Sequence, residues 1–96
     1  MYIKSEDFTN EFVESIIKHE KDVFFEKYTA EEKLIILETD RLRGKEYTQE
    51  MLCRILRARR KTQRDTLLLS VYELSEIQGF SAEFLELIAD IRQCPK

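Results

Sequence analysis

The sequence predicts an all-α fold, a compact bundle of about four helices in which the third helix is long, over about residues 49–78. The 96 residues include only two glycines and one proline, so few positions favour tight turns or helix ends. Apolar residues make up 43% of the chain and recur every three or four positions, as on one face of a helix. Charged residues make up 36% and are balanced in sign, which is typical of a folded domain. We therefore expect one helical domain over residues 1–96.

The first predicted helix begins at Ser5, whose hydroxyl can cap the free backbone N–H groups of a first turn. Phe8, Phe12 and Ile16 then follow at helical spacing. The polar stretch at residues 19–22 interrupts this pattern. Two alternatives stay open, because the helix can either continue to about residue 27 or break at this stretch.

The second and fourth predicted helices are recognised by their caps. Thr29 and Glu32 have the spacing of a capping box, in which each side chain bonds to the other's backbone N–H, and Gly44 is suited to end that helix. Ser81 is expected to cap the fourth helix, whose apolar stripe includes Phe84.

The third predicted helix can be capped by Thr48, and no breaker follows before Gly79. About thirty residues at about 1.5 Å each give a length of about 45 Å. A compact domain of this size is only about 30–35 Å across. The helix must therefore bend, project from the domain, or lie along a partner.

The first half of this helix carries a basic face, and its second half is apolar on all sides. The candidate partner-binding residues on the basic face are Arg54, Arg57, Arg60, Lys61 and Arg64. Arg59 falls on the apolar side, where it must pair or extend to the surface. The basic face is interpreted as a solvated surface, as a match for acidic side chains of the same protein, or as a site for an external acidic partner.

The apolar half is expected to be enclosed, either by the other helices or by a second copy of the chain. The residues assigned to self-association or to the core are Leu67, Leu68, Val71, Tyr72 and Leu74.

No catalytic, metal or cofactor site is expected. The chain has one histidine, His19, without a second ligand at a recognised spacing, and no glycine-rich phosphate loop. Cys53 and Cys94 are interpreted as reduced packing residues rather than a disulfide. The sequence therefore predicts a protein that is not an enzyme.

The chain is expected to be cytoplasmic, without a membrane contact. It has a net charge of −3, no apolar stretch near the about 20 residues that span a bilayer, and a start unlike an export signal.

The leading functional hypothesis is a small interaction or regulatory protein that binds a protein partner of unknown identity and forms a homodimer through its long helix. The alternative is a DNA- or RNA-binding regulator that uses the basic face of residues 54–64. The acidic chain counts against it, as does the position of the basic residues well after the Thr48 cap. A third hypothesis, a helical adaptor from a phage or mobile element, fits the small size.

Overall fold

The computed structural model describes residues 1–89 and the backbone of residues 92–95, and it shows an α/β protein. Its elements, in chain order, are β1 (Tyr2–Lys4), α1 (Ser5–Ile17), α2 (Lys21–Ala30), β2 (Lys33–Leu37), η1 (Thr39–Leu42), α3 (Glu46–Lys61), β3 (Asp65–Ser70), η2 (Leu74–Glu76), α4 (Ala82–Ile88) and β4 (Arg92–Pro95). The two η elements are single turns of 3₁₀-helix. The predicted all-α bundle is therefore wrong.

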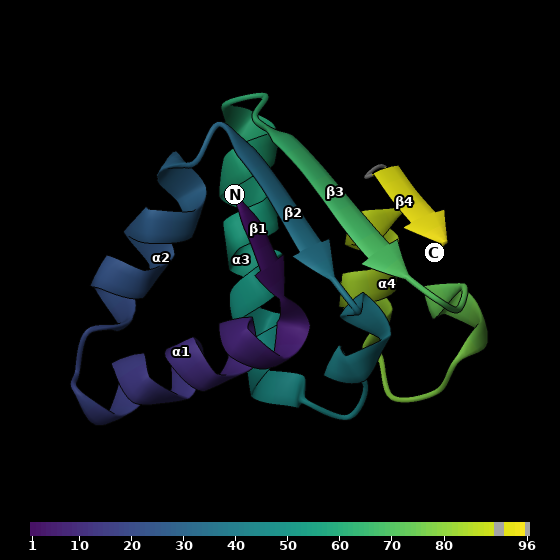
Figure 1. The fold of residues 1–96 in the computed structure, drawn as a ribbon, viewed down its shortest axis with the longest axis horizontal. Coiled ribbons are helices and arrows are strands. Elements are labelled where there is room, and N and C mark those ends of the chain that lie inside the picture. Colours follow the sequence, from purple (N-terminus) through teal and green to yellow (C-terminus); the bar gives the residue numbers. More distant parts are fainter. Residues whose placement is uncertain (90–91, 96) are drawn as a thin grey trace.

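The four strands form one parallel sheet in the order β1-β2-β3-β4, so each strand pairs with the next strand of the chain. Crossovers between parallel strands are nearly always right-handed, and successive crossovers in one direction place their helices on the same face of the sheet. Figure 1 shows this arrangement, with the strands in front and α3 and α4 behind them. One face of the sheet is covered by helices and the other faces outward.

The largest difference from the sequence-based prediction concerns the third helix, which is much shorter than predicted. Helix α3 ends at Lys61, a turn follows in which Gln63 has a φ of 56°, and the chain reverses into β3. Leu67 and Leu68, which were expected on the apolar half of that helix, lie in this strand, whereas Leu74 lies in η2. A short apolar run fits a strand of a parallel sheet as well as a buried helix, and periodicity does not separate the two. The helix proposed for self-association therefore does not exist.

The second predicted helix is also wrong over most of its length. Thr29 lies near the end of α2 rather than at a helix start, and residues 33–37 form β2.

The alternative left open at residues 19–22 is decided in favour of a break, because α1 ends at Ile17 and His19 takes a φ of 58°. Helix α3 begins at Glu46 and has no side-chain cap, so Thr48 is not its cap. The cap at Ser81 is confirmed, since its hydroxyl accepts a hydrogen bond from the Phe84 N–H.

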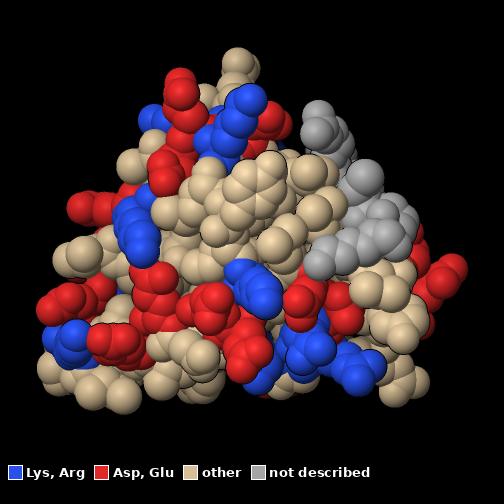
Figure 2. Space-filling model, viewed as in Figure 1, with Lys and Arg blue, Asp and Glu red and all other residues tan. Residues whose placement is uncertain are grey.

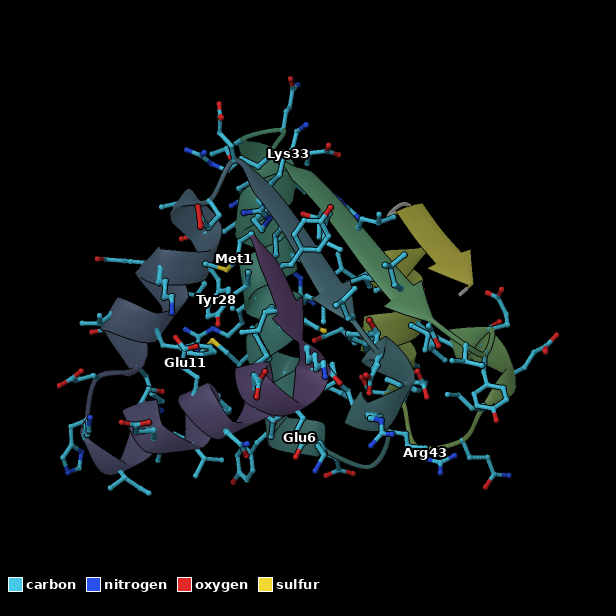
Figure 3. The ribbon with its side chains drawn as sticks, viewed as in Figure 1. Met1, Glu6, Glu11, Tyr28, Lys33 and Arg43 are labelled. Atoms are coloured by element: carbon cyan, nitrogen blue, oxygen red, sulfur yellow. The ribbon has the colours of Figure 1, made fainter. Side chains whose placement is uncertain are left out.

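An aromatic cluster joins α1 to α2. Phe8 and Phe12 of α1 contact Phe24 of α2 at centroid distances of 5.2 and 5.4 Å, and Tyr28 packs edge-on against Phe8 at 4.9 Å. The Tyr28 hydroxyl donates to Glu11 Oε2 at 2.8 Å, and Figure 3 shows the two side chains between the helices. Burial, followed by the hydrogen bond to the Glu11 carboxylate, raises the pKa of Tyr28. The two helices thus form one packed unit beside the sheet.

A buried arginine holds the connections at the amino ends of β2 and β3. Arg59 is 1% exposed, and its guanidinium donates to the carbonyl oxygens of residues 28, 31, 32 and 65 and to the Thr66 hydroxyl, at 2.5–3.3 Å. These five contacts match the five N–H groups of a guanidinium. Burial, and then the nearby Arg64, lowers the pKa of Arg59. The sequence-based expectation that Arg59 must pair or reach the surface is met by pairing with backbone carbonyls.

No helix among the described residues is long and apolar enough to cross a membrane.

Substitution of Arg59 by methionine is expected to lower the free energy of unfolding by about 3 kcal/mol or more, because several buried carbonyls lose their donors. Urea denaturation measures the change. Arg54→Met, at an exposed position of the same helix, is the matched control and should change stability by less than about 0.5 kcal/mol. If both variants lower the free energy of unfolding by the same amount, the role assigned to Arg59 is contradicted.

Cys53 is buried and forms no disulfide with any residue whose side chain is described, as expected for a reduced packing residue; the side chain of Cys94 lies outside the described part. Burial raises the pKa of the Cys53 thiol from 9.0 to about 11, with a further contribution from Glu83.

In a Cys94→Ser background at pH 8, alkylation of Cys53 should be about a hundredfold slower in the folded protein than in urea, because the thiolate is the reactive form. The folded-state rate should keep rising as the pH approaches 11. Equal rates with and without urea would rule out this burial.

Candidate nucleic-acid interface

A groove of about 440 Å³ lies between α1 and the loop that precedes α3. Its lining residues are Glu6, Thr9, Asn10, Arg41, Arg43 and Lys45. Figure 3 shows Glu6 and Arg43 on the same edge of the molecule, one from α1 and the other from the loop. Three of the six lining side chains are cationic, which distinguishes this groove from the rest of an acidic chain.

The buried side chain of Gln49 fastens the loop to the fold. Its amide nitrogen donates to the carbonyl oxygens of Leu42 and Gly79, both at 2.7 Å. Its amide oxygen accepts from the Ser81 N–H at 3.0 Å. One side chain therefore holds the loop before α3 against the segment before α4, and the outward direction of the basic residues is set by this attachment.

The two glycines of the chain meet at this attachment. The Gly44 N–H donates to the Gly79 carbonyl at 2.7 Å, and both residues have positive φ, 76° and 101°. A Cβ at Gly79 would lie 2.8 Å from the Gly44 nitrogen, closer than real contacts allow. Glycine is thus required at residue 79 both by conformation and by space.

Two of the three cations in the groove have no ion pair among the described residues. Arg41 is paired, with its Nε 2.8 Å from Glu38 Oε2, whereas the exposed Arg43 and Lys45 form no such bridge there. Glu38, at the carboxyl end of β2, has a φ of 55°. The free cations give the groove a local positive charge that suits phosphate groups.

Exposed apolar and aromatic side chains follow the groove residues on both of the segments that line it. Tyr47, two positions after Lys45, is 80% exposed. On α1, Val13 and Ile17 are 47% and 72% exposed and share the outer face of the helix with Asn10 of the groove wall. Cations beside flat or apolar side chains are the combination that binds single-stranded nucleic acids, because the bases stack while the phosphates pair.

The basic face predicted from the sequence is largely bonded within the molecule. Arg57 pairs with Glu83 of α4 at 3.1 Å, Arg60 donates to the Leu87 carbonyl at 3.1 Å, and Arg64 donates to the Ala30 carbonyl at 3.0 Å. Arg54 and Lys61 are exposed. The structure therefore does not bring the five residues together as one free surface, and whether they bind a partner stays a prediction.

The residues predicted for self-association or the core are spread over β3 and the segment after it. Leu68 and Leu74 are buried, Leu67 is half-buried, and Val71 and Tyr72 are 54% and 58% exposed. They do not lie on one helix, and their role in self-association stays a prediction.

The carboxyl ends of the strands, where parallel sheets commonly bind ligands, carry two acidic residues. Asp40 Oδ1 lies 3.2 Å from the hydroxyl of Ser70 at the end of β3. The hydroxyl of Ser5 donates to the Glu38 carbonyl oxygen at 2.6 Å, which ties the start of α1 to the end of β2. At this edge one serine hydroxyl is thus bonded to a carboxylate and another to a backbone carbonyl.

Comparison with known proteins assigns the chain to a family. A family model described as the bacterial DnaA ATPase domain matches residues 1–88. The chain belongs to the bacterial DnaA ATPase domain family. This membership overturns two expectations drawn from the sequence, that the protein is a small non-enzymatic regulator and that it is not an enzyme, because the family is one of ATPase domains.

Solved structures of DnaA proteins show the same fold. A DNA replication initiation factor is 21% identical and superposes with a TM-score of 0.92, over 99% of this chain and 30% of that one. Domain III of the replication initiation protein DnaA from Thermotoga maritima is 24% identical with a TM-score of 0.90, over 97% of this chain and 39% of that one. A replication initiator DnaA bound to AMPPCP and single-stranded DNA is 21% identical with a TM-score of 0.91, over 99% of this chain and 30% of that one. The chain thus spans about a third of the length of these DnaA structures.

The residues described here do not fit a complete nucleotide site of a DnaA ATPase. The phosphate-binding loop of P-loop ATPases has the pattern G-x-x-x-x-G-K-[ST], and the glycines of this chain, at residues 44 and 79, cannot supply it. The acids at the sheet edge are engaged, Glu38 with Arg41 and Asp40 with Ser70. Within the described part of the chain, no three His, Cys, Asp or Glu side chains group so as to hold a metal ion.

Sequence reasoning missed the groove because it placed residues 41–45 at the end of a helix. The signal that could have found them is the alternation Arg41-Leu42-Arg43-Gly44-Lys45, followed by Tyr47. Basic side chains attract phosphate groups, and an aromatic ring offers a surface on which a base can stack.

The internal bonds of the predicted basic face lead to a stability test. Arg60→Glu should lower stability by about 1 kcal/mol, since it removes the donor to the Leu87 carbonyl and places an acid near the carboxyl end of α4. For a domain of this size the melting temperature should fall by about 4–8 °C, measured by circular dichroism. Lys61→Glu, at the neighbouring exposed position, serves as control and should change it little. If the two variants have the same melting temperature, the Arg60 contact does not stabilise the fold.

Proposed function

We propose that the chain acts in the initiation of DNA replication and that the groove between α1 and the loop before α3 binds single-stranded DNA. The observation that carries this proposal is the pair of groove cations, Arg43 and Lys45, that have no ion pair among the described residues, followed two positions later in the chain by the exposed Tyr47. The family assignment and a DnaA relative whose structure holds single-stranded DNA support it. Bacterial replication takes place in the cytoplasm, which is therefore the proposed location.

Each part of the groove has a role in this proposal. Arg43 and Lys45 pair with successive phosphates, and Tyr47 stacks on a base. Val13 and Ile17 provide an apolar surface against which further bases or sugars can lie. Glu6, on the opposite wall, is an acid that a phosphate must avoid, so the strand is expected to follow the loop side of the groove.

Single strands are favoured over duplex DNA because stacking on Tyr47 requires bases that are not already stacked within a helix. ATP hydrolysis, which the family name implies for a whole domain, requires a phosphate-binding loop that these 96 residues do not contain. DNA binding in this groove requires no such loop.

A titration of a fluorescently labelled oligothymidylate, followed by anisotropy at about 50 and 200 mM salt, tests the proposal. The double variant Arg43→Ala/Lys45→Ala should bind at least about tenfold more weakly than the wild type. The slope of log K against log salt should become shallower by about 1.4, as expected when two phosphate contacts with a single strand are lost.

The matched control is Arg54→Ala/Lys61→Ala, which removes the same charge from exposed positions of α3. It should bind nearly as tightly as the wild type. Tyr47→Ala should weaken binding by about 1–3 kcal/mol, whereas Tyr72→Ala, another exposed tyrosine, should not. A wild-type chain that fails to bind at the lower salt, or an α3 double variant that loses more affinity than the loop variant, would disprove the proposed interface.

A further inference from the structure

The third cation of the groove, Arg41, is held by an acid of the same chain. Its Nε lies 2.8 Å from Glu38 Oε2, and among the described residues no other ion pair involves a side chain that lines the groove. Figure 2 shows acidic and basic side chains next to one another along the lower part of the molecule, where Figure 3 labels Glu6 and Arg43. A carboxylate bonded to a guanidinium offsets much of the charge that a phosphate would otherwise meet.

The backbone around Glu38 fixes the position of this acid. The Ser5 hydroxyl donates to the Glu38 carbonyl oxygen at 2.6 Å, and the Arg41 backbone N–H donates to the same oxygen at 3.0 Å. The side chain of Glu38 is 27% exposed, whereas that of Arg41 is 65% exposed. The acid is therefore the fixed member of the pair, and the arginine is the member with room to reorient.

Most of the donors of Arg41 remain available. A guanidinium carries five N–H groups, and only the one on Nε is bonded to Glu38. The terminal nitrogens of Arg41 form no bond with another described residue. Because Arg41 lines the groove together with Arg43 and Lys45, these donors can serve a phosphate that is bound there.

A bound strand can compete with Glu38 for this arginine. An ion pair whose arginine is largely in solvent is screened by water and contributes little to stability. Once Arg43 and Lys45 hold two phosphates, the next phosphate of the same strand is kept near Arg41 at a high effective concentration. The carboxylate opposes this third contact, because it repels the phosphate and offers the guanidinium another partner.

We propose that Glu38 limits the affinity of the groove for single-stranded DNA by neutralising Arg41, so that a groove with three cations binds as one with two. This inference rests on the function proposed above for the groove. Glu38 is not among the residues that line the groove, so it acts through Arg41 and not by contact with the strand. The affinity of the site is thus set by an acid at the carboxyl end of β2 as well as by its cations.

The anisotropy titration with labelled oligothymidylate tests this role. Glu38→Gln keeps the shape and a hydrogen-bonding oxygen but removes the charge, and it should bind at least about fivefold more tightly than the wild type. The slope of log K against log salt should become steeper by about 0.7, as expected for one further phosphate contact with a single strand.

The matched control is Glu83→Gln, which changes the net charge equally and releases Arg57 of α3 from a pair of the same kind. It should bind within about twofold of the wild type, because Arg57 does not line the groove. A Glu38→Gln variant that binds like the wild type, or a Glu83→Gln variant that gains as much, would overturn the role of Glu38.

A double-mutant cycle tests whether the effect passes through Arg41. In an Arg41→Ala background, Glu38→Gln should no longer tighten binding, because no guanidinium is left to release. A gain that persists in this background would mean that the carboxylate acts on the strand directly, and the proposal would be wrong. Far-ultraviolet circular dichroism spectra like that of the wild type show that the variants are folded.

Failure of this inference can be told apart from failure of the proposed function. If the wild type binds and Arg43→Ala/Lys45→Ala does not, while Glu38→Gln leaves affinity and salt slope unchanged, only the role of Glu38 is disproved. If neither the wild type nor Glu38→Gln binds at about 50 mM salt, the groove is not a DNA site and both proposals are wrong.

Discussion

The fold depends on satisfying a set of backbone carbonyls at the amino ends of β2 and β3, and one guanidinium does so. Arg59 reaches from the last turn of α3 to the end of α2, to the connection before β2 and to the start of β3. Buried carbonyls without donors are costly, and a buried cation is tolerated only when its N–H groups are bonded. The arginine and the connections therefore stabilise each other, and the register of β2 with β3 begins at the residues that it contacts.

The opposite end of the molecule uses a neutral side chain for a similar purpose. Gln49 bonds to the loop before α3 and to the segment before α4, and the close approach of Gly44 and Gly79 completes this junction. The loop is attached at its base, and Arg43 and Lys45 are exposed without an ion pair among the described residues. The two ends of α3 thus have different roles, one in holding the sheet together and the other in presenting a charged surface.

Part of this structure could be predicted from the sequence. The cap at Ser81, the helical spacing of Phe8 and Phe12, and the need of Arg59 for partners were recognised because each depends on nearby residues. The strands were missed, since they are short apolar runs next to helices and the turn at Gln63 uses a left-handed residue that is not glycine. The groove was missed for a related reason: Arg43 and Lys45 became neighbours of α1 only through the parallel pairing of β1 with β2, which no local pattern reveals.

The order of the strands has a consequence for how the protein is made. Among the four strands described, each pairs with the one synthesised just before it, so each new strand finds its neighbour already made. The nascent chain can add one strand–helix unit at a time to an existing template. A sheet whose central strand came last would leave an unpaired gap between its outer strands during synthesis, whereas here each new strand is added at an edge.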